Sequence, residues 1–433
     1  MRILFVTPYP LSRIKVRSYG FVNHLVKQHE VVVLALCATE KEIADVRALK
    51  HEGIDITAIE EKRRFQLLRS LGAVGTQLPL QVAFCAAPHL RAAISARVES
   101  GRFDLIHVEA LRTLGALPNS LPIPVVLDMV DCISRLYEQG SRFGATPIMR
   151  FIGKNEARRI RAFERQQLQR FHDILVSSER DRQALLELTG GSSDDTTERT
   201  LAKITALPHG VDQHYFHPHT GHRQPGTLIF SGTMSYHANV AGVHTLVEDI
   251  LPHIWERRPH IRLVIAGSNP PASVRRLARD PRIEVTGYVP DLRPYIVQAQ
   301  VAVSPLPYAA GIQNKVLEAM ALGTPVVASS SVSAGLQALA GHDLLVADTP
   351  EEFAAAVLRL LDDQVLWNKL AERGLAYIAM HHDWEHIMRR LTAVYTNAVG
   401  MANLIAPAST GNERKAFSMA KGAFHSKQSA TKP

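Results

Sequence analysis

The feature that most constrains this chain is the regular alternation of short β-rich runs with longer helical stretches. Such an alternation predicts βαβ units, which build a mostly parallel sheet, so we predict an α/β fold. The predicted strands of the first half are Arg2–Val6, Val31–Leu36, Ile54–Ile59, Leu105–Val108, Val125–Leu127, Ile174–Ser177 and Ile204–Leu207. Those of the second half are Thr227–Phe230, Arg262–Ala266, Ile283–Thr286, Val301–Ser304, Pro325–Ala328 and Leu344–Val346. Helices are predicted between them, notably Tyr19–Gln28 and a long one around Arg150–Arg170.

The pattern breaks over residues 208–226, and this break divides the chain into two domains. We expect Rossmann-like domains at residues 1–210 and 225–383, a helix at residues 384–402 and a disordered basic tail at residues 403–433. The break is rich in histidines whose irregular spacing indicates a solvated linker rather than a metal site. These are His209, His214, His217, His219 and His222.

Composition excludes several classes of protein. The chain has 46% hydrophobic and 21% charged residues, and no apolar run near the ~20 residues that span a bilayer. Its first strand is too short for a secretory signal, so we expect a cytoplasmic protein. The three cysteines show no metal-ligand spacing, and no metal is expected. The tail carries half of the net charge of +8, which argues against nucleic-acid binding.

The stretch from Ser304 to Ala328 carries the most chemical information. It is typical of a strand end, a loop rich in Pro and Gly, an amphipathic helix and a further strand. Open α/β sheets bind ligands at the carboxyl ends of their strands, so this loop is a candidate site. The amides of residues 311–315 are expected to point from a helix N-terminus toward an anion such as a pyrophosphate, and Lys315 adds a positive charge. Glu318, on the same side of the helix, can accept hydrogen bonds from sugar hydroxyls. A surface salt pair between Lys315 and Glu318 is the alternative.

The segment Gly311-Ile-Gln-Asn-Lys-Val-Leu-Glu-Ala-Met-Ala-Leu-Gly-Thr-Pro-Val-Val327 resembles the donor-site segment of the retaining GT-B glycosyltransferases of family four. Further motifs follow the family's order along nearly the whole chain: the start at residues 1–10, Pro208-His-Gly-Val-Asp212, Phe230-Ser-Gly-Thr-Met234, Leu263-Val-Ile-Ala-Gly267 and Val285-Thr-Gly-Tyr-Val-Pro-Asp291. The nearest likeness is to the bacterial exopolysaccharide branch with a Gly-Ile-Gln-Asn-Lys loop. The resemblance implies two Rossmann-like domains that face a cleft, with the acceptor on the first, the donor on the second, and a C-terminal helix that returns to the first.

The resemblance also implies a set of donor-binding residues. These are Gly232, Thr233, Asn239, Tyr288, Val289, Gly311, Ile312, Gln313, Asn314, Lys315 and Glu318. Glu318 matches a ribose-binding carboxylate, and the turn at Tyr288 and Val289 matches one that holds the nucleobase through its backbone. Two departures stand out. Ala310 replaces the first glutamate of the family pattern, and an Arg/Lys pair that binds the pyrophosphate in many relatives is replaced by Thr233, His237 and Asn239. Lys315 is therefore the expected catalytic cation.

The first domain offers two further groups of candidates. Arg13, Lys15 and Arg17 lie where relatives keep a Gly-Gly loop, and they either contact donor phosphate or acceptor or form a solvated basic loop. His107, Asp128 and Asp131 lie at expected strand ends. His107 and Asp128 are candidate catalytic residues and Asp131 a candidate acceptor contact, able to activate or orient a hydroxyl. A hydrogen-bonded structural role is the alternative for all three.

One predicted helix carries basic residues at spacings of 4, 4, 3 and 4, which stack on one face: Arg150, Lys154, Arg158, Arg161 and Arg165. This basic stripe predicts peripheral contact with an anionic membrane surface, or else a solvated face buffered by Glu156 and Glu164.

We therefore expect transfer of a sugar from a nucleoside-diphosphate sugar to a glycan or lipid-linked acceptor hydroxyl, with retention, in exopolysaccharide or other cell-surface glycan synthesis. No cofactor beyond the sugar-nucleotide co-substrate is expected. The alternatives are a nucleotide-sugar epimerase or hydrolase on the same scaffold, and a non-catalytic nucleotide-sugar-binding partner. An oxidoreductase is disfavoured because no Gly-x-Gly-x-x-Gly follows a strand.

Overall fold

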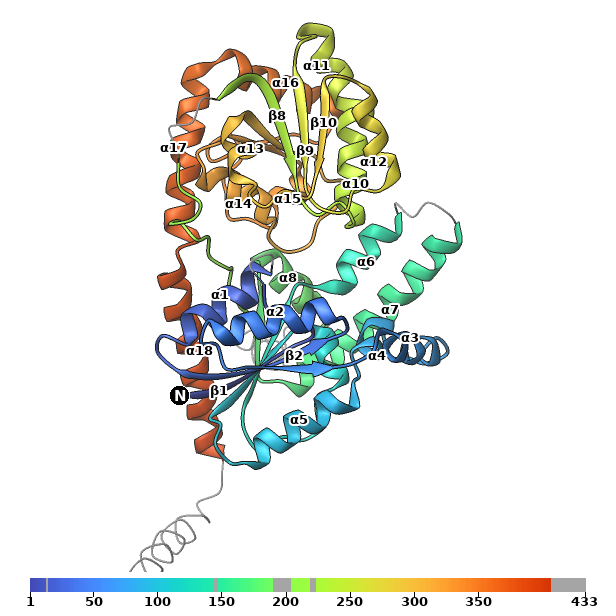
Figure 1. The fold of residues 1–433 in the computed structure, drawn as a ribbon, viewed down its shortest axis with the longest axis vertical. Coiled ribbons are helices and arrows are strands. Elements are labelled where there is room, and N and C mark those ends of the chain that lie inside the picture. The colour runs from blue at the N-terminus through green and yellow to red at the C-terminus, as the bar shows by residue number, and fades with distance from the viewer. Residues whose placement is uncertain (13–14, 143–146, 190–203, 219–222, 406–433) are drawn as a thin grey trace, which may run out of the picture.

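The computed structural model describes residues 1–12, 15–142, 147–189, 204–218 and 223–405. It contains two α/β domains that follow each other along the long axis of the molecule (Figure 1). Arg13, His219, His222 and residues 406–433 of the predicted tail lie outside the described residues.

The first domain is built on a parallel sheet whose described strands have the order β3-β2-β1-β4-β5-β6-β7. Their bounds are β1 (Arg2–Thr7), β2 (Glu30–Cys37), β3 (Ile56–Glu60), β4 (Leu105–Glu109), β5 (Val125–Val130), β6 (Asp173–Val176) and β7 (Ile204–Ala206). β1 pairs with β2 from Arg2 opposite Glu30, and with β4 from Ile3 opposite Leu105. Seven of the eight residues of β2 are buried, as expected for a strand of a parallel sheet that is covered on both faces.

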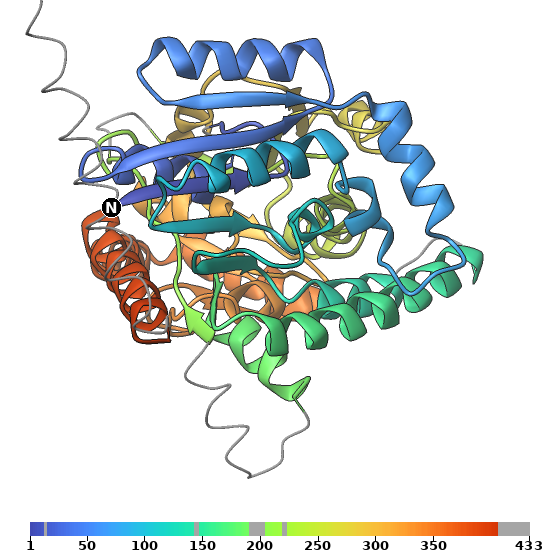
Figure 2. The ribbon, with the colours of Figure 1, turned by 90° about the horizontal axis from the view of Figure 1, so that it is seen from below.

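Helices cover both faces of this sheet (Figure 2). The described ones are α1 (Val16–Leu25), α2 (Glu40–His51), α3 (Arg63–Gly72), α4 (Leu80–Phe84), α5 (Pro88–Glu99), η1 (Leu111–Gly115), α6 (Ile133–Arg142), α7 (Pro147–Arg170) and α8 (Glu179–Glu187). Thr39 begins α2 with a capping box, because its hydroxyl accepts from the amide of Glu42 and the Glu42 carboxylate accepts from the amide of Thr39.

The second domain repeats this plan with a sheet of order β10-β9-β8-β11-β12-β13 in the described chain. Its strands are β8 (Gln224–Ser231), β9 (Arg262–Ala266), β10 (Ile283–Gly287), β11 (Ala299–Ser304), β12 (Val326–Ala328) and β13 (Leu345–Val346). Its helices are α10 (His237–His244), η2 (Thr245–Ile250), α11 (Leu251–Arg257), α12 (Ala272–Arg276), η3 (Leu277–Arg279), α13 (Arg293–Gln298), α14 (Asn314–Ala321), α15 (Ser330–Ser333), α16 (Pro350–Asp362) and α17 (Gln364–His381).

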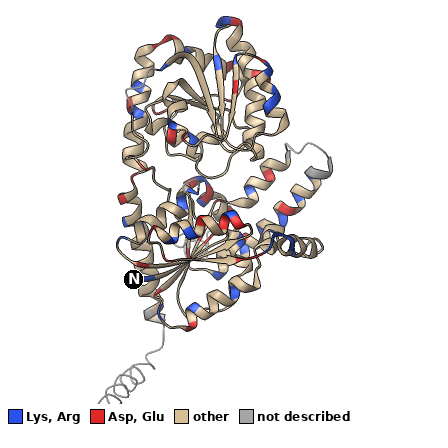
Figure 3. Ribbon diagram, in the orientation of Figure 1, with Lys and Arg blue, Asp and Glu red and all other residues tan. Residues whose placement is uncertain are grey.

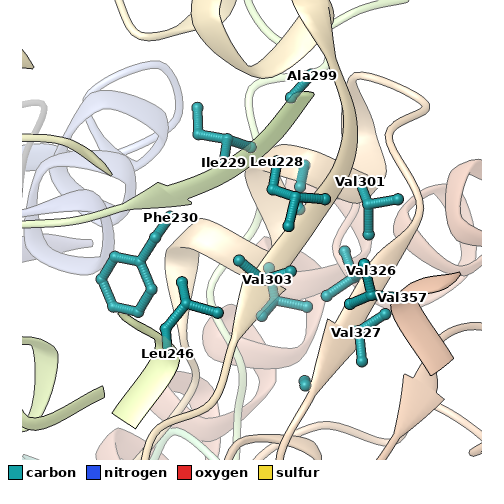
Figure 4. Close-up of a cluster of buried hydrophobic side chains, with 14 of the residues drawn as sticks. Leu228, Ile229, Phe230, Leu246, Ala299, Val301, Val303, Val326, Val327 and Val357 are labelled. Atoms are coloured by element: carbon teal, nitrogen blue, oxygen red, sulfur yellow. The ribbon is translucent and has the colours of Figure 1, made fainter. Parts of the chain in front are cut away.

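Aliphatic side chains from the strands and covering helices fill the core of the second domain. Figure 4 shows Val303 of β11, Val327 of β12 and Leu246 of η2 among them. These side chains are at most 2% exposed. Burial of this kind stabilises by about 25 cal/mol per Å² of apolar surface, which makes the sheet a rigid support for the loops at its ends.

The last described helix, α18 (Trp384–Ile405), packs against the first domain rather than the second. Its Trp384, Leu391 and Tyr395 share a buried cluster with Phe5 of β1. The contact is tight, because a Cβ on Gly20 of α1 would lie 2.0 Å from the Trp384 ring. The second domain is therefore tied to the first by both the linker around residue 210 and this returning helix.

Each predicted strand overlaps an observed one, but several ends differ. β4 and β5 run to Glu109 and Val130, one and three residues beyond the predicted ends. α1 begins at Val16 rather than Tyr19, and α7 begins at Pro147 rather than Arg150. Within the described ranges, no helix combines the length and the apolar character that a membrane crossing requires.

Candidate functional site

A glycine follows each of the strands β8 and β9 at its carboxyl end. Gly232 and Gly267, which follow these strands, have φ of 146° and 153°. The two turns touch, because a Cβ on Gly267 would lie 1.8 Å from the carbonyl oxygen of Gly232. No larger residue fits at position 267 without moving the turns apart. Gly232 is partly exposed, and the absence of a side chain there lets a ligand come close to the backbone.

Lys315 of α14 reaches this turn. Its ammonium donates to Asn239 Oδ1 at 2.5 Å, and Asn239 Nδ2 donates to the carbonyl of Thr233 at 2.9 Å. The same ammonium lies 4.4 Å from the centre of the Phe230 ring, and it would lie 3.2 Å from a Cβ on Gly232. Burial lowers the pKa of Lys315 to about 7, although nearby Glu318 opposes the shift. The structure thus holds a cation directly over the glycine turn that ends β8.

Lys315 lies in the first turn of its helix, as expected. α14 starts at Asn314, and Gln313 at its N-cap makes no side-chain capping hydrogen bond. Instead Gln313 Nε2 donates to the carbonyl of Ala310 at 2.9 Å, which closes the loop. Of the predicted amides 311–315, those of Asn314 and Lys315 belong to the first helical turn, where N–H groups have no partner within the helix.

Glu318 lies one turn further along α14 and is only partly exposed. Burial raises the pKa of its carboxyl to about 7, and Lys315 opposes the rise. No salt bridge within 4.0 Å joins Lys315 and Glu318, both of which are described, so the alternative of an exposed salt pair is wrong. Lys315 instead points back to Asn239 and leaves the Glu318 oxygens available.

The other donor-site candidates of the second domain surround this centre. Thr233 is exposed, Ile312 is partly exposed, and Val289 is partly exposed beside Tyr288, which is 71% exposed. Tyr288 follows Gly287 at the end of β10, where Gly287 has a φ of 69°. The structure thus brings the candidates from the ends of β8, β10 and β11 to one edge of the sheet.

Asp131 is the first-domain candidate that meets the donor loop. A Cβ on Gly311 would lie 2.1 Å from Asp131 Oδ1, so the loop and this carboxyl are in direct contact across the domain boundary. Ser177 donates to the same oxygen at 3.0 Å. Burial raises the pKa of Asp131 to about 7, and Asp181 adds to the rise. Val130, just before it, has a φ of 67°, a strained value for a β-branched residue that often marks functional sites.

A second contact across the boundary corrects the prediction that the linker histidines are all solvated. His209 is 6% exposed, and a hydrogen bond of 2.6 Å joins its Nε2 to Asn314 Oδ1. Its carbonyl accepts from His382 Nδ1 at 2.8 Å. Burial is the main cause that lowers the pKa of His209 to about 3, so this ring is neutral and fixes the start of α14. In the sequence, this role was indicated by the place of His209 in the Pro208–Asp212 motif, whereas the histidine-rich composition of the linker indicated exposure.

Two more contacts across the boundary could not be found from the sequence. His237 Nδ1 is hydrogen-bonded to the hydroxyl of Tyr308, and a Cβ on Gly140 of α6 would lie 3.6 Å from each ring. Arg180 of α8 donates to the carbonyl of Ser331 at 2.7 Å. These pairs join segments more than 70 residues apart, and no local pattern marks them.

His107 does not line the boundary, so its assignment as a catalytic residue is wrong. β4 continues to Glu109, which places His107 two residues inside the strand, and the ring is fully buried. It stacks on Phe5 with centroids 4.3 Å apart and shares a 2.8 Å hydrogen bond with the Tyr395 hydroxyl of α18. Burial lowers its pKa to about 4. His107 instead anchors the returning helix.

Asp128 and Arg17 neutralise each other inside the first domain. Asp128 is fully buried in β5 and accepts from Arg17 Nε at 2.7 Å and Nη2 at 3.0 Å. Arg17, 6% exposed, also donates to the carbonyl of Leu207. The catalytic role predicted for Asp128 and the phosphate or acceptor contact predicted for Arg17 are therefore both corrected to a buried structural pair.

Lys15 remains exposed, with its ammonium 4.5 Å from the centre of the Tyr9 ring. Arg112, which the sequence did not indicate, lies 5.0 Å from the same ring. The Tyr9 hydroxyl donates to buried Glu109 at 2.6 Å. In the described chain neither cation forms a salt bridge, so the end of β1 carries positive charge.

Within the described ranges, no three His, Cys, Asp or Glu side chains come together as a metal site would require. The positive charge at the donor loop comes from Lys315 instead.

Comparisons with known proteins agree with this architecture. Residues 225–363 match the family model for glycosyl transferases group 1. A sucrose-phosphate synthase from Thermosynechococcus elongatus superposes with a TM-score of 0.67 at 16% identity, over 93% of this chain and all of that one. Anabaena HepE in complex with UDP superposes with a TM-score of 0.63 at 13% identity, over 92% of this chain and all of that one. A mutant of S. aureus TarM in complex with Fondaparinux, alpha-GlcNAc-glycerol and UDP superposes with a TM-score of 0.63 at 9% identity, over 91% of this chain and all of that one.

No curated protein matches the chain. The chain has the two Rossmann-like domains of the GT-B fold, and the matched segment includes α14, which carries Lys315 and Glu318, and the turn at Tyr288.

Proposed function

We propose that the protein transfers a glycosyl group from a nucleoside-diphosphate sugar to an acceptor hydroxyl, with retention of the anomeric configuration. The observation that carries the proposal is the Lys315 ammonium, held by Asn239 above the Gly232 turn and beside the first amides of α14. A cation with free amide groups at a helix start is a favourable place for a diphosphate. The match of residues 225–363 to group 1 glycosyl transferases supports the same activity.

In this proposal the diphosphate is the leaving group, and Lys315 with the amides of Asn314 and Lys315 stabilises the charge that develops on it. Donors arranged before the reaction are worth most in a site that excludes water. The positive charge of Lys315 would stabilise the departing diphosphate, as a bound metal ion does in other enzymes. We therefore propose that transfer needs no metal and no other cofactor. Turnover should persist in the presence of EDTA.

The rest of the nucleotide extends along the sheet edge. Glu318 would accept the ribose hydroxyls, because its oxygens are not engaged by Lys315. The exposed turn at Tyr288 and Val289 would contact the base. Gly311, Ile312 and Gln313 would line the sugar, and Ala310 leaves room where relatives place a carboxylate.

Asp131 faces the donor loop from the acceptor side, and we propose that it orients the acceptor hydroxyl. The bond between the anomeric carbon and the diphosphate oxygen breaks, and the acceptor oxygen forms its bond on the same face of the sugar, which is what retention requires. The hydroxyl proton goes to Asp131, whose pKa of about 7 suits a proton acceptor at neutral pH.

Cell-surface glycan synthesis, including exopolysaccharide, is the setting that we propose, with a glycan or lipid-linked acceptor. The basic stripe supports peripheral membrane contact, since Arg150, Lys154, Arg158, Arg161 and Arg165 are all exposed on α7. Glu156 and Glu164 are buried, so the alternative in which they buffer this face is wrong.

A thermal-shift screen with UDP, GDP, ADP and their sugars tests donor binding, because a ligand at about 100 times its Kd stabilises by roughly 2.7 kcal/mol. NMR analysis of products, with and without acceptor sugars, then tests transfer. Release of free sugar or an epimer without acceptor would favour the epimerase or hydrolase alternative, which the missing carboxylate at Ala310 keeps open. Binding with no turnover would favour a non-catalytic partner.

A further inference from the structure

Helix α3 has its polar side turned toward the protein. Gln66 is 3% exposed, and Arg69 donates to Glu61 Oε1 at 3.0 Å. Ser70 donates to the carbonyl of Leu80 at 3.1 Å. At about 100° of rotation per residue, Gln66, Arg69 and Ser70 occupy roughly 100° of the helix surface. This face rests on α4 and its neighbours through hydrogen bonds rather than through an apolar core.

The opposite side of α3 is apolar and open. Its large side chains and one in the following loop are between 44% and 67% exposed: Phe65, Leu67, Leu68, Leu71 and Val74. A helix that stabilises a soluble domain normally buries its apolar stripe against the core. In α3 the apolar side chains instead face away from the core. They form one continuous exposed surface along the helix rather than single scattered residues.

The helix is fixed in this orientation. Buried Arg159 of α7 donates to the carbonyl of Ala73 at 2.9 Å, and also to the carbonyls of Val74 and Thr76. Glu156 of α7 accepts from the amide of Leu80 at 2.6 Å. α3 and the start of α7 therefore lie at one side of the first domain (Figure 2).

The exposed charges of residues 62–80 and of α7 have one sign. Residues 62–80 include no acidic residue, and Lys62, Arg63 and Arg64 are exposed. On α7 the two acidic residues, Glu156 and Glu164, are 5% and 0% exposed. Figure 3 colours the basic residues of both helices blue.

We propose that α3 is an interfacial helix that lies on an anionic lipid surface, with Phe65, Leu68 and Leu71 among the lipid chains. Exposed apolar side chains flanked by Lys and Arg match the two parts of such a surface, the acyl boundary and the anionic headgroups. A second copy of this chain fits less well, because it would bring the same positive charges into the contact.

Attachment through α3 is separate from the proposed glycosyl transfer and from the basic stripe of α7. The stripe lies roughly 140° around α7 from Arg159, the residue that faces the loop after α3. The stripe alone offers charge, and its binding would disappear in high salt. Attachment through α3 includes an apolar contribution that salt does not screen.

The test is flotation of the full chain with vesicles of phosphatidylcholine containing about a third phosphatidylglycerol, at low and high salt. The test variant is Leu68→Glu with Leu71→Glu, both on the exposed face. The matched control is Val365→Glu with Met380→Glu, which are 78% and 70% exposed on α17. A stripe variant, Arg158→Gln with Arg161→Gln, completes the set, and circular dichroism confirms that all are folded.

We expect the wild type to float with anionic vesicles and a fraction to remain bound in 1 M salt. The α3 variant should lose at least tenfold in partitioning, while the control on α17 should lose less than twofold. The stripe variant should lose only salt-sensitive binding. If the wild type does not float, or if the α3 variant floats as the wild type does, the inference is wrong. If light scattering shows a dimer that only the α3 variant abolishes, without flotation, the face belongs to a second copy instead.

Discussion

Replacing Lys315 by Met removes the charge at the donor loop while keeping most of the side chain's length. In the structure this ammonium has one hydrogen-bond acceptor, Asn239 Oδ1, and forms no salt bridge in the described part of the chain. It is therefore available to a diphosphate, and its loss should act mainly on the step in which the diphosphate departs.

Two estimates set the size of the effect. A charge about 4 Å from a phosphate oxygen, at an effective dielectric constant near 20, contributes about 4 kcal/mol. Removal of one donor from a developing charge typically lowers turnover about 10²–10³-fold, or roughly 2.7–4 kcal/mol. We therefore expect kcat to fall at least about 100-fold in Lys315→Met.

Stability should change in the opposite direction. Burial lowers the pKa of Lys315, which means that the folded protein keeps this charge at a cost. An apolar replacement should leave the Tm unchanged or raise it. A large loss of turnover with an unaltered Tm separates a role in transfer from a role in folding.

The assay is release of nucleoside diphosphate from the donor found in the thermal-shift screen, measured with wild type, Lys315→Met and Lys15→Met. Lys15 is the control because it is an exposed lysine at the N-cap of α1. Its replacement should reduce kcat less than about tenfold. Equal and small losses at the two lysines would refute the assignment of Lys315.

Three further outcomes follow from the first domain. Asp131→Asn should lower kcat about 100-fold or more without lowering the Tm, and a kcat within threefold of wild type would remove Asp131 from the reaction. Asp128→Ala leaves the buried Arg17 charge unpaired and should destabilise by about 3–5 kcal/mol, which lowers the Tm by about 6 °C or more, whereas an unchanged Tm would contradict the buried pair. His107→Phe should cost about 1–3 kcal/mol, through its lost bond to Tyr395, and leave the pH profile of kcat unchanged, because the His107 ring is already neutral at neutral pH. A shifted profile would return His107 to the catalytic candidates.

The strands could be predicted from the sequence because apolar β-rich runs between helices are a local signal. The ends of the strands could not be predicted as well. The true ends determine which of the candidate catalytic residues are buried in the sheet. β5 runs to Val130, three residues beyond the prediction, so Asp128 lies inside the sheet while Asp131 lies just past its end. One strand end therefore separates a structural carboxylate from the one that meets the donor loop.

The donor loop was accessible from the sequence because its residues lie within a short segment that also carries a family resemblance. Contacts between distant segments were not accessible in the same way. The position of His209 in a linker rich in histidines predicted exposure, whereas packing against Asn314 and His382 buries it. The outward-facing apolar side of α3 was missed for a similar reason, since an amphipathic pattern does not say which side meets the core.

Calorimetric titration of nucleoside diphosphate into the protein at pH 7 and pH 8, in two buffers with different ionisation enthalpies, tests whether Lys315 binds the diphosphate. Because the pKa of Lys315 is about 7 in the free protein, most molecules hold a neutral lysine at pH 8, and a bound diphosphate should restore its proton. We expect uptake of nearly one proton per ligand at pH 8 and a Kd that weakens up to about tenfold for each pH unit above 7. Lys315→Met should lose both effects and bind at least about 30-fold more weakly at pH 7. Binding of equal strength in the two proteins, with no proton uptake in either, would contradict the placement of the diphosphate at Lys315.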